Sequence, residues 1–405
     1  HRLFFVSSVV MLLCAVMPAQ KLKVYILAGQ SNMEGHAKVT TFDYIGEDKA
    51  TAPLLAEMRD KKGRPTVCDD VWISYLTGSP GNDGEGIGRL TAGFGARRNP
   101  KQDGGKIGPE FTFGLRMDKA SKEPVLIIKT AWGGKSLHTD FRSPSAGPYQ
   151  FNDKQIAQFA KQGKDFAKIK AEKAAATGHY HRLMIEHVKY VLSDIKRVFP
   201  GYKKSRGFEL AGFVWFQGWN DMVDRGTYPQ RDRPGGYEQY SDCMAHFIRD
   251  VRKDLAAPKL PFVIGVMGVS GPIKGRRKRL VHGNFRAAMA QPAELREFRG
   301  NVVAVATSPF WDTKLDEVAQ RMDKVRNMER MLRTKNKNHA NKDGSMSKQQ
   351  QRAYIDEYRK EVISDEDAAM FARGASNAGY HYLGCAKTMA QIGYAFADAL
   401  LQLQR

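Results

Sequence analysis

A serine near the start of this sequence stands where it could do acyl-transfer chemistry. Ser31 follows the apolar run 24–28 and a short turn, and it precedes an expected helix start. A serine at the carboxyl end of a buried parallel strand can attack an acyl carbon, while backbone N–H groups behind it bind the oxyanion. Taken alone, Ser31 is explained equally well as a simple helix cap.

Two downstream residues could act with Ser31. His381 lies between two tyrosines, just before an apolar helical pattern over 383–401. Histidine is the natural proton acceptor for a serine near neutral pH, although a lone histidine among aromatic residues is more often structural. Asn220 follows the apolar run 213–216, so its amide could donate to an oxyanion or could stabilise an ordinary turn.

Five short apolar segments, each bounded by glycine, proline or polar turns, predict the strands that position these residues. They are 24–28, 125–129, 213–216, 262–267 and 302–306. Helical patterns fill several gaps between them, which indicates a central parallel five-stranded sheet covered on both faces, an α/β three-layer sandwich. Open sheets of this class place their sites at the carboxyl ends of the strands, where Ser31, Asn220 and the turn Gly133-Gly134 fall.

The organisation expected around this sheet is one elaborated domain over residues 20–405. The segment 75–108 is rich in glycine and shows no periodicity, so we expect a long loop insertion. The segment 313–375 is highly charged and compatible with helices over 315–332 and 347–359, so we expect a helical flap or subdomain.

Residues 1–19 resemble a secretory signal peptide. They contain a basic Arg2, a short apolar core and a small-residue site ending at Ala19. The stretch is too short to be taken as a membrane span, so we expect cleavage after Ala19 and a secreted or periplasmic protein with no integral span. Three cysteines then remain, which allow one disulfide with one free thiol or three buried thiols: Cys68, Cys243 and Cys385.

The charge balance favours anionic partners. Lysine and arginine number 64 against 43 acidic residues, a formal net charge of +21. In a secreted protein this suggests an acidic or sulfated polysaccharide, whereas the dense cluster 274–279 lacks the interleaved aromatic residues typical of nucleic-acid binding. His179, His181 and His187 open an amphipathic helix with no carboxylate or cysteine at ligand spacing, so we expect packing rather than a metal site.

Three blocks of this sequence resemble those of the SGNH hydrolases in order and spacing. They are Gly29-Gln30-Ser31-Asn32-Met33, Gly218-x-Asn220-Asp221 and His381. More closely, the chain resembles the sialate O-acetylesterase domain and the acetylxylan esterases of carbohydrate esterase family 6, over roughly residues 23–401. The resemblance implies a flavodoxin-like SGNH fold, with Ser31 as nucleophile and His381 as general base.

The same resemblance implies an oxyanion hole. Its donors would be the backbone N–H of Ser31, a glycine of the pair Gly133-Gly134 and the side chain of Asn220, with Gly108 as a second candidate for the glycine.

One position departs from the family pattern. SGNH enzymes typically carry an aspartate three residues before the histidine, but this chain has Ala378 there and Asn377 one residue further back. Our candidate for the acid is Asp312, and a dyad assisted by a backbone carbonyl is the other possibility. Because losing an orienting carboxylate costs about 10⁴ in turnover in a triad enzyme, a non-catalytic glycan-binding pseudoenzyme of the same fold is the alternative.

The function predicted from the sequence is a secreted carbohydrate O-acetylesterase. It would remove acetyl groups from a polysaccharide or acidic glycan through a Ser–His mechanism with an acetyl-enzyme intermediate and no cofactor. Gln30, Gln217 and Trp132 are assigned to substrate binding. Tryptophans near the strand ends could stack on sugars, although at least half are more simply core residues: Trp132, Trp215, Trp219 and Trp311.

Two other classes are weaker alternatives. A lipase or thioesterase of the same superfamily would be expected to show an apolar rim instead of a basic, glycine-rich one. A basic scaffold for anionic polymers would lose binding in salt and would be indifferent to Ser31.

Overall fold

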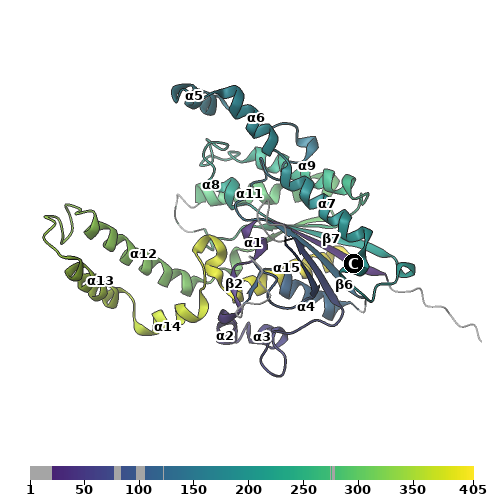
Figure 1. The fold of residues 1–405 in the computed structure, drawn as a ribbon, viewed down its shortest axis with the longest axis horizontal. Coiled ribbons are helices and arrows are strands. Elements are labelled where there is room, and N and C mark those ends of the chain that lie inside the picture. Colours follow the sequence, from purple (N-terminus) through teal and green to yellow (C-terminus); the bar gives the residue numbers. More distant parts are fainter. Residues whose placement is uncertain (1–20, 77–83, 97–104, 122, 274, 276–278) are drawn as a thin grey trace, which may run out of the picture.

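A seven-stranded sheet forms the centre of the protein, with helices on both faces (Figure 1). The computed structural model describes residues 21–76, 84–96, 105–121, 123–273, 275 and 279–405. The strand order is β4-β3-β6-β1-β7-β8-β9. β4 pairs with β3 in the antiparallel sense and every other pair in this sheet is parallel. The bounds are β1 Leu22–Gly29, β3 Val71–Leu76, β4 Glu85–Arg89, β6 Val125–Ala131, β7 Phe208–Phe216, β8 Phe262–Val266 and β9 Val302–Ala306.

The α/β class is as predicted, and the five predicted strands are β1, β6, β7, β8 and β9. The prediction of only five strands was wrong, because β3 and β4 extend the sheet at one edge. The expected loop over 75–108 also contains β4 and the short β5, although its segments 77–83 and 97–104 lie outside the described residues. β4 reads Glu-Gly-Ile-Gly-Arg, and such an edge strand needs no continuous apolar run.

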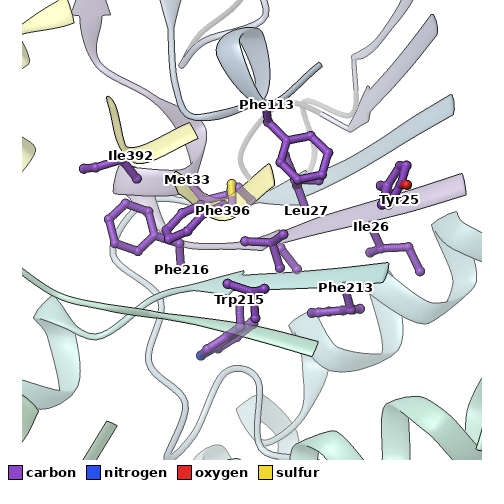
Figure 2. Close-up of a cluster of buried hydrophobic side chains, with 14 of the residues drawn as sticks. Tyr25, Ile26, Leu27, Met33, Phe113, Phe213, Trp215, Phe216, Ile392 and Phe396 are labelled. Carbon is purple, nitrogen blue, oxygen red and sulfur yellow. The ribbon is translucent and has the colours of Figure 1, made fainter. Parts of the chain in front are cut away.

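The centre of the core surrounds β1. Figure 2 shows Ile26 and Leu27 of β1 among aromatic side chains from β7 and the helices, including Phe213 and Phe396. Both faces of β1 are covered, which explains its continuous apolar sequence. At its end β1 approaches β7 so closely that a Cβ on Gly29 would lie 2.1 Å from the carbonyl oxygen of Phe216. Only glycine fits at this position, directly before the turn that carries Ser31.

Helices α4 and α15 cover one face of the sheet, and α7, α9 and α11 cover the other (Figure 1). Their bounds are α4 Glu110–Ala120, α15 Ala386–Leu403, α7 His179–Ser193, α9 Glu238–Asp254 and α11 Asn284–Ala290. The short elements near the site are α1 Ser31–Glu34, β2 Ala37–Lys38, α2 Asp43–Gly46, α3 Ala52–Met58, β5 Lys106–Ile107, α8 Trp219–Val223 and the 3₁₀ segment η9 Gly379–Gly384. Shorter helical turns, one of them a π turn, are η1 Val39–Thr41, η2 Pro144–Ala146, η3 Ile195–Arg197, η4 Lys204–Arg206, η5 Arg279–Gly283, η6 Gln291–Glu294, η7 Arg296–Phe298 and η8 Ser308–Phe310.

Two helical arms leave this body (Figure 1). The larger is formed by α12 Thr313–Arg333, α13 Lys348–Val362 and α14 Asp365–Gly374, which confirms the helices expected in the charged insertion. It has a small apolar cluster of its own, made of Val318, Val325, Leu332, Ile355 and Ile363. The smaller arm is α5 Asp153–Lys161 and α6 Phe166–Ala176. Because α14 ends just before the turn that carries His381, the larger arm is rooted beside the candidate site.

Cys68, Cys243 and Cys385 are buried free thiols, so the second alternative for these three cysteines is correct. Residues 1–19, interpreted as a signal peptide, lie outside the described part of the chain, as does most of the basic cluster 274–279. Among the helices that the structure describes, none combines the length and apolar character needed to span a bilayer.

Candidate active site

Ser31 opens the single-turn helix α1 at the carboxyl end of the central strand. Gln30 before it is extended, so the chain turns sharply from strand to helix. Ser31 is nearly buried, with 8% of its surface exposed. Neither its hydroxyl nor its backbone N–H has a hydrogen-bond partner among the described residues. A free N–H is expected in the first turn of a helix, and here it lies next to the candidate nucleophile.

His381 is held by Asn377, the residue four positions before it. Nδ1 of His381 lies 2.9 Å from Oδ1 of Asn377. The backbone N–H of Ala378 donates to the same oxygen over 2.8 Å, which fixes the orientation of the amide. Because Oδ1 can only accept, Nδ1 must carry the imidazole proton. Nε2 of His381 therefore presents a lone pair, as a general base requires.

The turn around His381 is pinned to the sheet by Tyr382. Tyr382 and Leu383 both adopt positive φ values, 51° and 60°, which side chains rarely favour. The Tyr382 phenol is buried, accepts from the Gly268 N–H at 2.7 Å and lies 2.6 Å from the Thr307 hydroxyl. These bonds tie η9 to the segments that follow β8 and β9, and they hold the unusual backbone in place.

One further hydrogen bond ties the His381 turn to the Ser31 turn. The Asn32 side chain donates to the carbonyl oxygen of Tyr380 at 3.2 Å, so α1 and η9 are in contact. The Ser31 hydroxyl and His381 form no direct hydrogen bond. Such bonds are often long before substrate binds and tighten in the complex.

Burial keeps His381 neutral. Desolvation, aided by the neighbouring His36 and Lys106, lowers its pKa to about 3. At neutral pH the ring is therefore available to accept a proton, but it is intrinsically a weak base.

The glycine pair after β6 borders Ser31. A Cβ built on Gly133 would lie 3.8 Å from the Ser31 Cβ, and the backbone N–H groups of Gly133 and Gly134 have no partner among the described residues. Gly108, the second candidate, is differently placed. Its N–H already donates to Glu110 Oε1 at 2.9 Å, so the structure leaves the glycine pair as the available donors.

Asp221 organises this edge of the sheet. Its carboxylate is fully buried and accepts from the backbone N–H groups of Leu137 at 2.8 Å and His138 at 3.1 Å. It also accepts from the Gln217 amide at 2.6 Å and the Tyr228 hydroxyl at 3.0 Å. The carboxylate thus fixes the loop after the glycine pair to the end of β7. Sequence reasoning placed Asp221 in a motif but gave it no role.

The residues assigned to substrate binding are mostly internal. Gln30 is 1% exposed, and its Oε1 accepts from the Gly218 N–H and the Gln217 amide, both at 3.2 Å. Gln217 and Trp132 are also buried, the latter against Tyr180. With so little surface these three side chains connect and support the strand ends, and their assignment to substrate binding stays a prediction. By contrast, the half-buried Asn220 side chain has no hydrogen-bond partner among the described residues.

A buried ion pair between α4 and β6 holds the end of α1 in place. Lys129 and Glu110 are both fully buried, with 2.8 Å between Nζ and Oε2. Lys129 also donates to the carbonyl oxygens of Glu34 at 2.8 Å and Phe94 at 2.7 Å. The last residue of α1 is therefore anchored to the centre of β6.

The family of the chain follows from residues 21–308, which match the family described as carbohydrate esterase, sialic acid-specific acetylesterase. The chain belongs to this family. Membership indicates a carbohydrate acetylesterase. No curated protein sequence matches the chain.

Three solved structures resemble this family member, each at low identity. A protein from Arabidopsis thaliana is 16% identical, with 71% of this chain and 86% of that chain covered and a TM-score of 0.37. A carbohydrate acetylesterase from Xanthomonas citri is 14% identical, with 70% and 49% covered and a TM-score of 0.38. NanS is 13% identical, with 72% and 79% covered and a TM-score of 0.38.

Asp312, expected as the acid of this esterase, is engaged elsewhere. It caps α12 by accepting from the Leu315 N–H at 3.0 Å, and it pairs with Lys387 at 2.5 Å. It makes no hydrogen bond to His381, whose Nδ1–H donates to Asn377 instead. Asp312 is held away from His381 because the positive N-terminus of α12 and the ammonium of Lys387 both attract its carboxylate.

An aromatic surface lies beside His381. Trp132, Trp215 and Trp311 are buried, as expected for core residues. Trp219 is half-buried and lies 5.8 Å from the ring of Tyr380, which is 45% exposed. The Tyr380 ring also contacts the His381 ring edge-on at 4.5 Å between centroids. The sequence pattern around His381 contained Tyr380 but did not indicate this surface.

The other histidine group is part of the packing. His181 and His187 lie on the buried side of α7 and bond to Asp254 and Ser74. Among the residues that the structure describes, no three histidine, cysteine or acidic side chains are grouped so as to hold a metal ion.

Proposed function

We propose that this family member is a carbohydrate O-acetylesterase in which Ser31 is the nucleophile and His381 is the general base. The observation that carries the proposal is the hydrogen bond from His381 Nδ1 to Asn377 Oδ1, which leaves the Nε2 lone pair free. Support also comes from the bond between Asn32 and Tyr380, which joins the two turns.

The reaction would proceed in two acyl transfers. Ser31 Oγ bonds to the acetyl carbon while its proton passes to His381 Nε2, and the carbonyl electrons move to the oxyanion. When the tetrahedral species collapses, the bond to the sugar oxygen breaks and that oxygen takes the proton from His381. Water then attacks the acetyl-enzyme by the same route, which releases acetate and restores Ser31. None of these steps uses a cofactor.

Three donors would stabilise the oxyanion. They are the Ser31 N–H, an N–H of the pair Gly133-Gly134 and the Asn220 amide, which are unpaired in the described structure. Donors that are already in place in a partly buried site stabilise the developing charge without reorganisation.

The substrate we propose is an acetylated polysaccharide or oligosaccharide, preferably an anionic one. The surface made by Trp219 and Tyr380 offers a sugar-stacking face next to the base. The net charge of +21 favours acidic chains, and the character of residues 1–19 supports export from the cell.

The test is acetate release from a panel of acetylated polysaccharides and from a small aryl acetate. We expect the parent to release acetate, and we expect Ser31→Ala and His381→Ala to lower kcat by at least about 10³-fold with unchanged unfolding temperatures. A parent that releases acetate from no acetyl ester overturns the esterase and leaves a glycan-binding protein of the same fold.

A further inference from the structure

The far end of the larger helical arm is strongly basic. The arm tip is defined as residues 330–352, which comprise the end of α12, the connecting turn and the start of α13. Figure 1 shows this turn at the end of the arm that lies farthest from the sheet. The arm tip contains seven cations and one acidic residue, Asp343, a formal charge of +6. All seven cations are exposed: Arg330, Arg333, Lys335, Lys337, Lys342, Lys348 and Arg352.

The rest of the arm has the opposite charge balance. Residues 313–329 and 353–374 contain seven cations and ten acidic residues, a formal charge of −3. Here cations find partners within the arm, as Arg321 does with Asp367 at 3.0 Å. No carboxylate in the described part of the chain forms an ion pair with a cation of the arm tip. A surface that is charged only for solubility mixes both signs, so this separation indicates a surface for an anionic partner.

The turn that carries these cations has a defined structure. Asn341 is 2% exposed, its Nδ2 donates to the Leu332 carbonyl oxygen at 2.9 Å and its Oδ1 accepts from the Met346 N–H at 2.9 Å. The side chain of Ser347 then caps α13 through a capping box with Gln350. The cations therefore project from an ordered surface.

The smaller arm is a weaker candidate for the same role. Residues 153–176 contain six lysines and three acidic residues, which alternate along the two helices. Lys173 lies over the Tyr149 ring at 4.5 Å and donates to the Thr139 hydroxyl at 3.3 Å. Lys164 lies over the Phe159 ring at 5.9 Å. This arm thus has a smaller excess of charge, and part of that charge is already used.

The chemistry of the arm tip fits an anionic polysaccharide. Residues 330–352 contain no phenylalanine, tyrosine or tryptophan, the side chains on which single-stranded bases stack. None of the large apolar side chains that the structure shows exposed lies on this arm, so a membrane would find no apolar anchor there. Asn338 and Gln349 are exposed among the cations, and their amides can hydrogen-bond hydroxyl groups. A hydroxyl-rich chain with sulfate or carboxylate groups matches both the charges and the amides.

The arm joins this surface to the candidate active site. α12 begins directly after Asp312 and contacts η9, the turn that carries His381. α14 ends at Gly374, three residues before Asn377. With 21 residues, α12 is about 30 Å long. A chain bound at the arm tip therefore reaches the strand ends only if it is long enough to span the arm.

We propose that the arm tip binds the sulfate or carboxylate groups of a long anionic polysaccharide and holds the chain close to the strand ends. Its cations replace the counterions of the polymer, and the release of those ions drives binding. The carbohydrate nature of the partner rests on the proposed function, whereas its negative charge follows from the arm tip itself.

The test is binding of fluorescently labelled polymers by the full chain, measured by anisotropy over a series of salt concentrations. The probes are heparin, which is sulfated, and polygalacturonate, which is carboxylated. The tip variant combines Arg333→Gln, Lys335→Gln, Lys337→Gln and Lys342→Gln. With at least one probe we expect its affinity at low salt to fall by about 10- to 100-fold. The slope of log K against log salt should become shallower by about 3, because fewer counterions are released.

A matched control separates the arm tip from net charge. It removes the same charge from the same arm, outside the tip: Lys324→Gln, Arg326→Gln, Arg359→Gln and Lys360→Gln. We expect the control to bind both probes within about 3-fold of the parent. Unfolding temperatures report whether each variant folds. Lys337→Gln with Lys342→Gln is the milder tip variant if four changes impair folding, and a loss of about 3- to 10-fold is expected for it.

Three results overturn the inference. The first is a folded tip variant that binds both polysaccharides as the parent does, and the second is an equal loss in the tip and control variants. The third is a parent that binds a DNA duplex or phosphatidylserine vesicles more tightly than either polysaccharide at equal charge concentration. Binding is measured without turnover, so a chain that holds heparin at the arm tip but hydrolyses no ester contradicts the proposed esterase and not this surface.

Discussion

Ser74 and His187 form a serine–histidine pair with better contacts than Ser31 and His381, yet this pair cannot supply a nucleophile. Ser74 Oγ lies 2.9 Å from His187 Nε2 and 2.5 Å from Glu85 Oε1, which completes a serine, a histidine and a carboxylate in direct contact. Ser31 and His381 form no such bond. Distance alone would therefore select the wrong pair.

The positions of the protons and the accessibility of the two serines explain why the pair of Ser74 and His187 cannot supply a nucleophile. The Ser74 hydroxyl has one proton, and if it donates to Glu85 then His187 Nε2 must donate to Oγ. His187 then has no lone pair directed at the serine. Ser74 is also fully buried within β3, while Ser31 lies at the strand ends beside unpaired N–H groups. A nucleophile needs the correct tautomer, oxyanion donors and an open approach, and of these two pairs the one at the strand ends has the arrangement that we propose for catalysis.

The largest difference should appear in covalent capture by a fluorophosphonate. We expect one adduct per chain, on Ser31, formed at least about 10³-fold faster than any adduct on Ser74. Intact mass and peptide mapping would measure this.

Two variants check the assignment of the adduct. Ser31→Ala should abolish labelling, and Ser74→Ala should leave its rate within about 3-fold. An adduct on Ser74 would contradict the comparison.

The positions of Ser31, Asn220 and the glycine pair could be predicted because they follow strands whose apolar runs are visible in the sequence. Asn377 could not, since its contact with His381 depends on a turn that Tyr382 fixes through Gly268 and Thr307. Nor could the burial of Gln30, which is set by tertiary packing. The same limit applies to β4, an edge strand without an apolar pattern.

Each pair has a third polar residue, Asn377 beside His381 and Glu85 beside Ser74. Removing these two residues in turn should separate function from stability. Asn377→Leu deletes the acceptor for His381 Nδ1–H, and we expect kcat to fall by about 100-fold with little change in KM. Glu85→Gln instead breaks the pair with Arg197 and weakens the bond to Ser74. It should keep kcat within about 3-fold and lower the free energy of unfolding by about 1–3 kcal/mol.

Urea unfolding and steady-state kinetics on the same preparations give both quantities. If Glu85→Gln lost activity while remaining fully folded, or Asn377→Leu lost only stability, the division between the two groups would be wrong.

The smallest expected effect is a difference in how the two histidines respond to acid. Burial lowers the pKa of His187 to about 4, below its ordinary value near 6.5. A depressed pKa means that the unfolded chain binds the proton more readily, so the stability from neutral His187 is complete above pH 6.5 and is lost as pH falls through about 4. His187→Gln should therefore flatten the free energy of unfolding over this interval, although Glu85, whose pKa is also lowered, contributes in the same direction.

His381 should respond in activity instead. Its lowered pKa keeps the base neutral below pH 6.5, so kcat/KM should stay level there and decline only in more acid solution. His187→Gln should leave the position of that decline unchanged, because His187 serves Ser74 and not the reacting atoms. An acid limb centred at pH 6.5 in the parent would show that water reaches His381 freely, and it would contradict the burial that lowers the pKa of this ring.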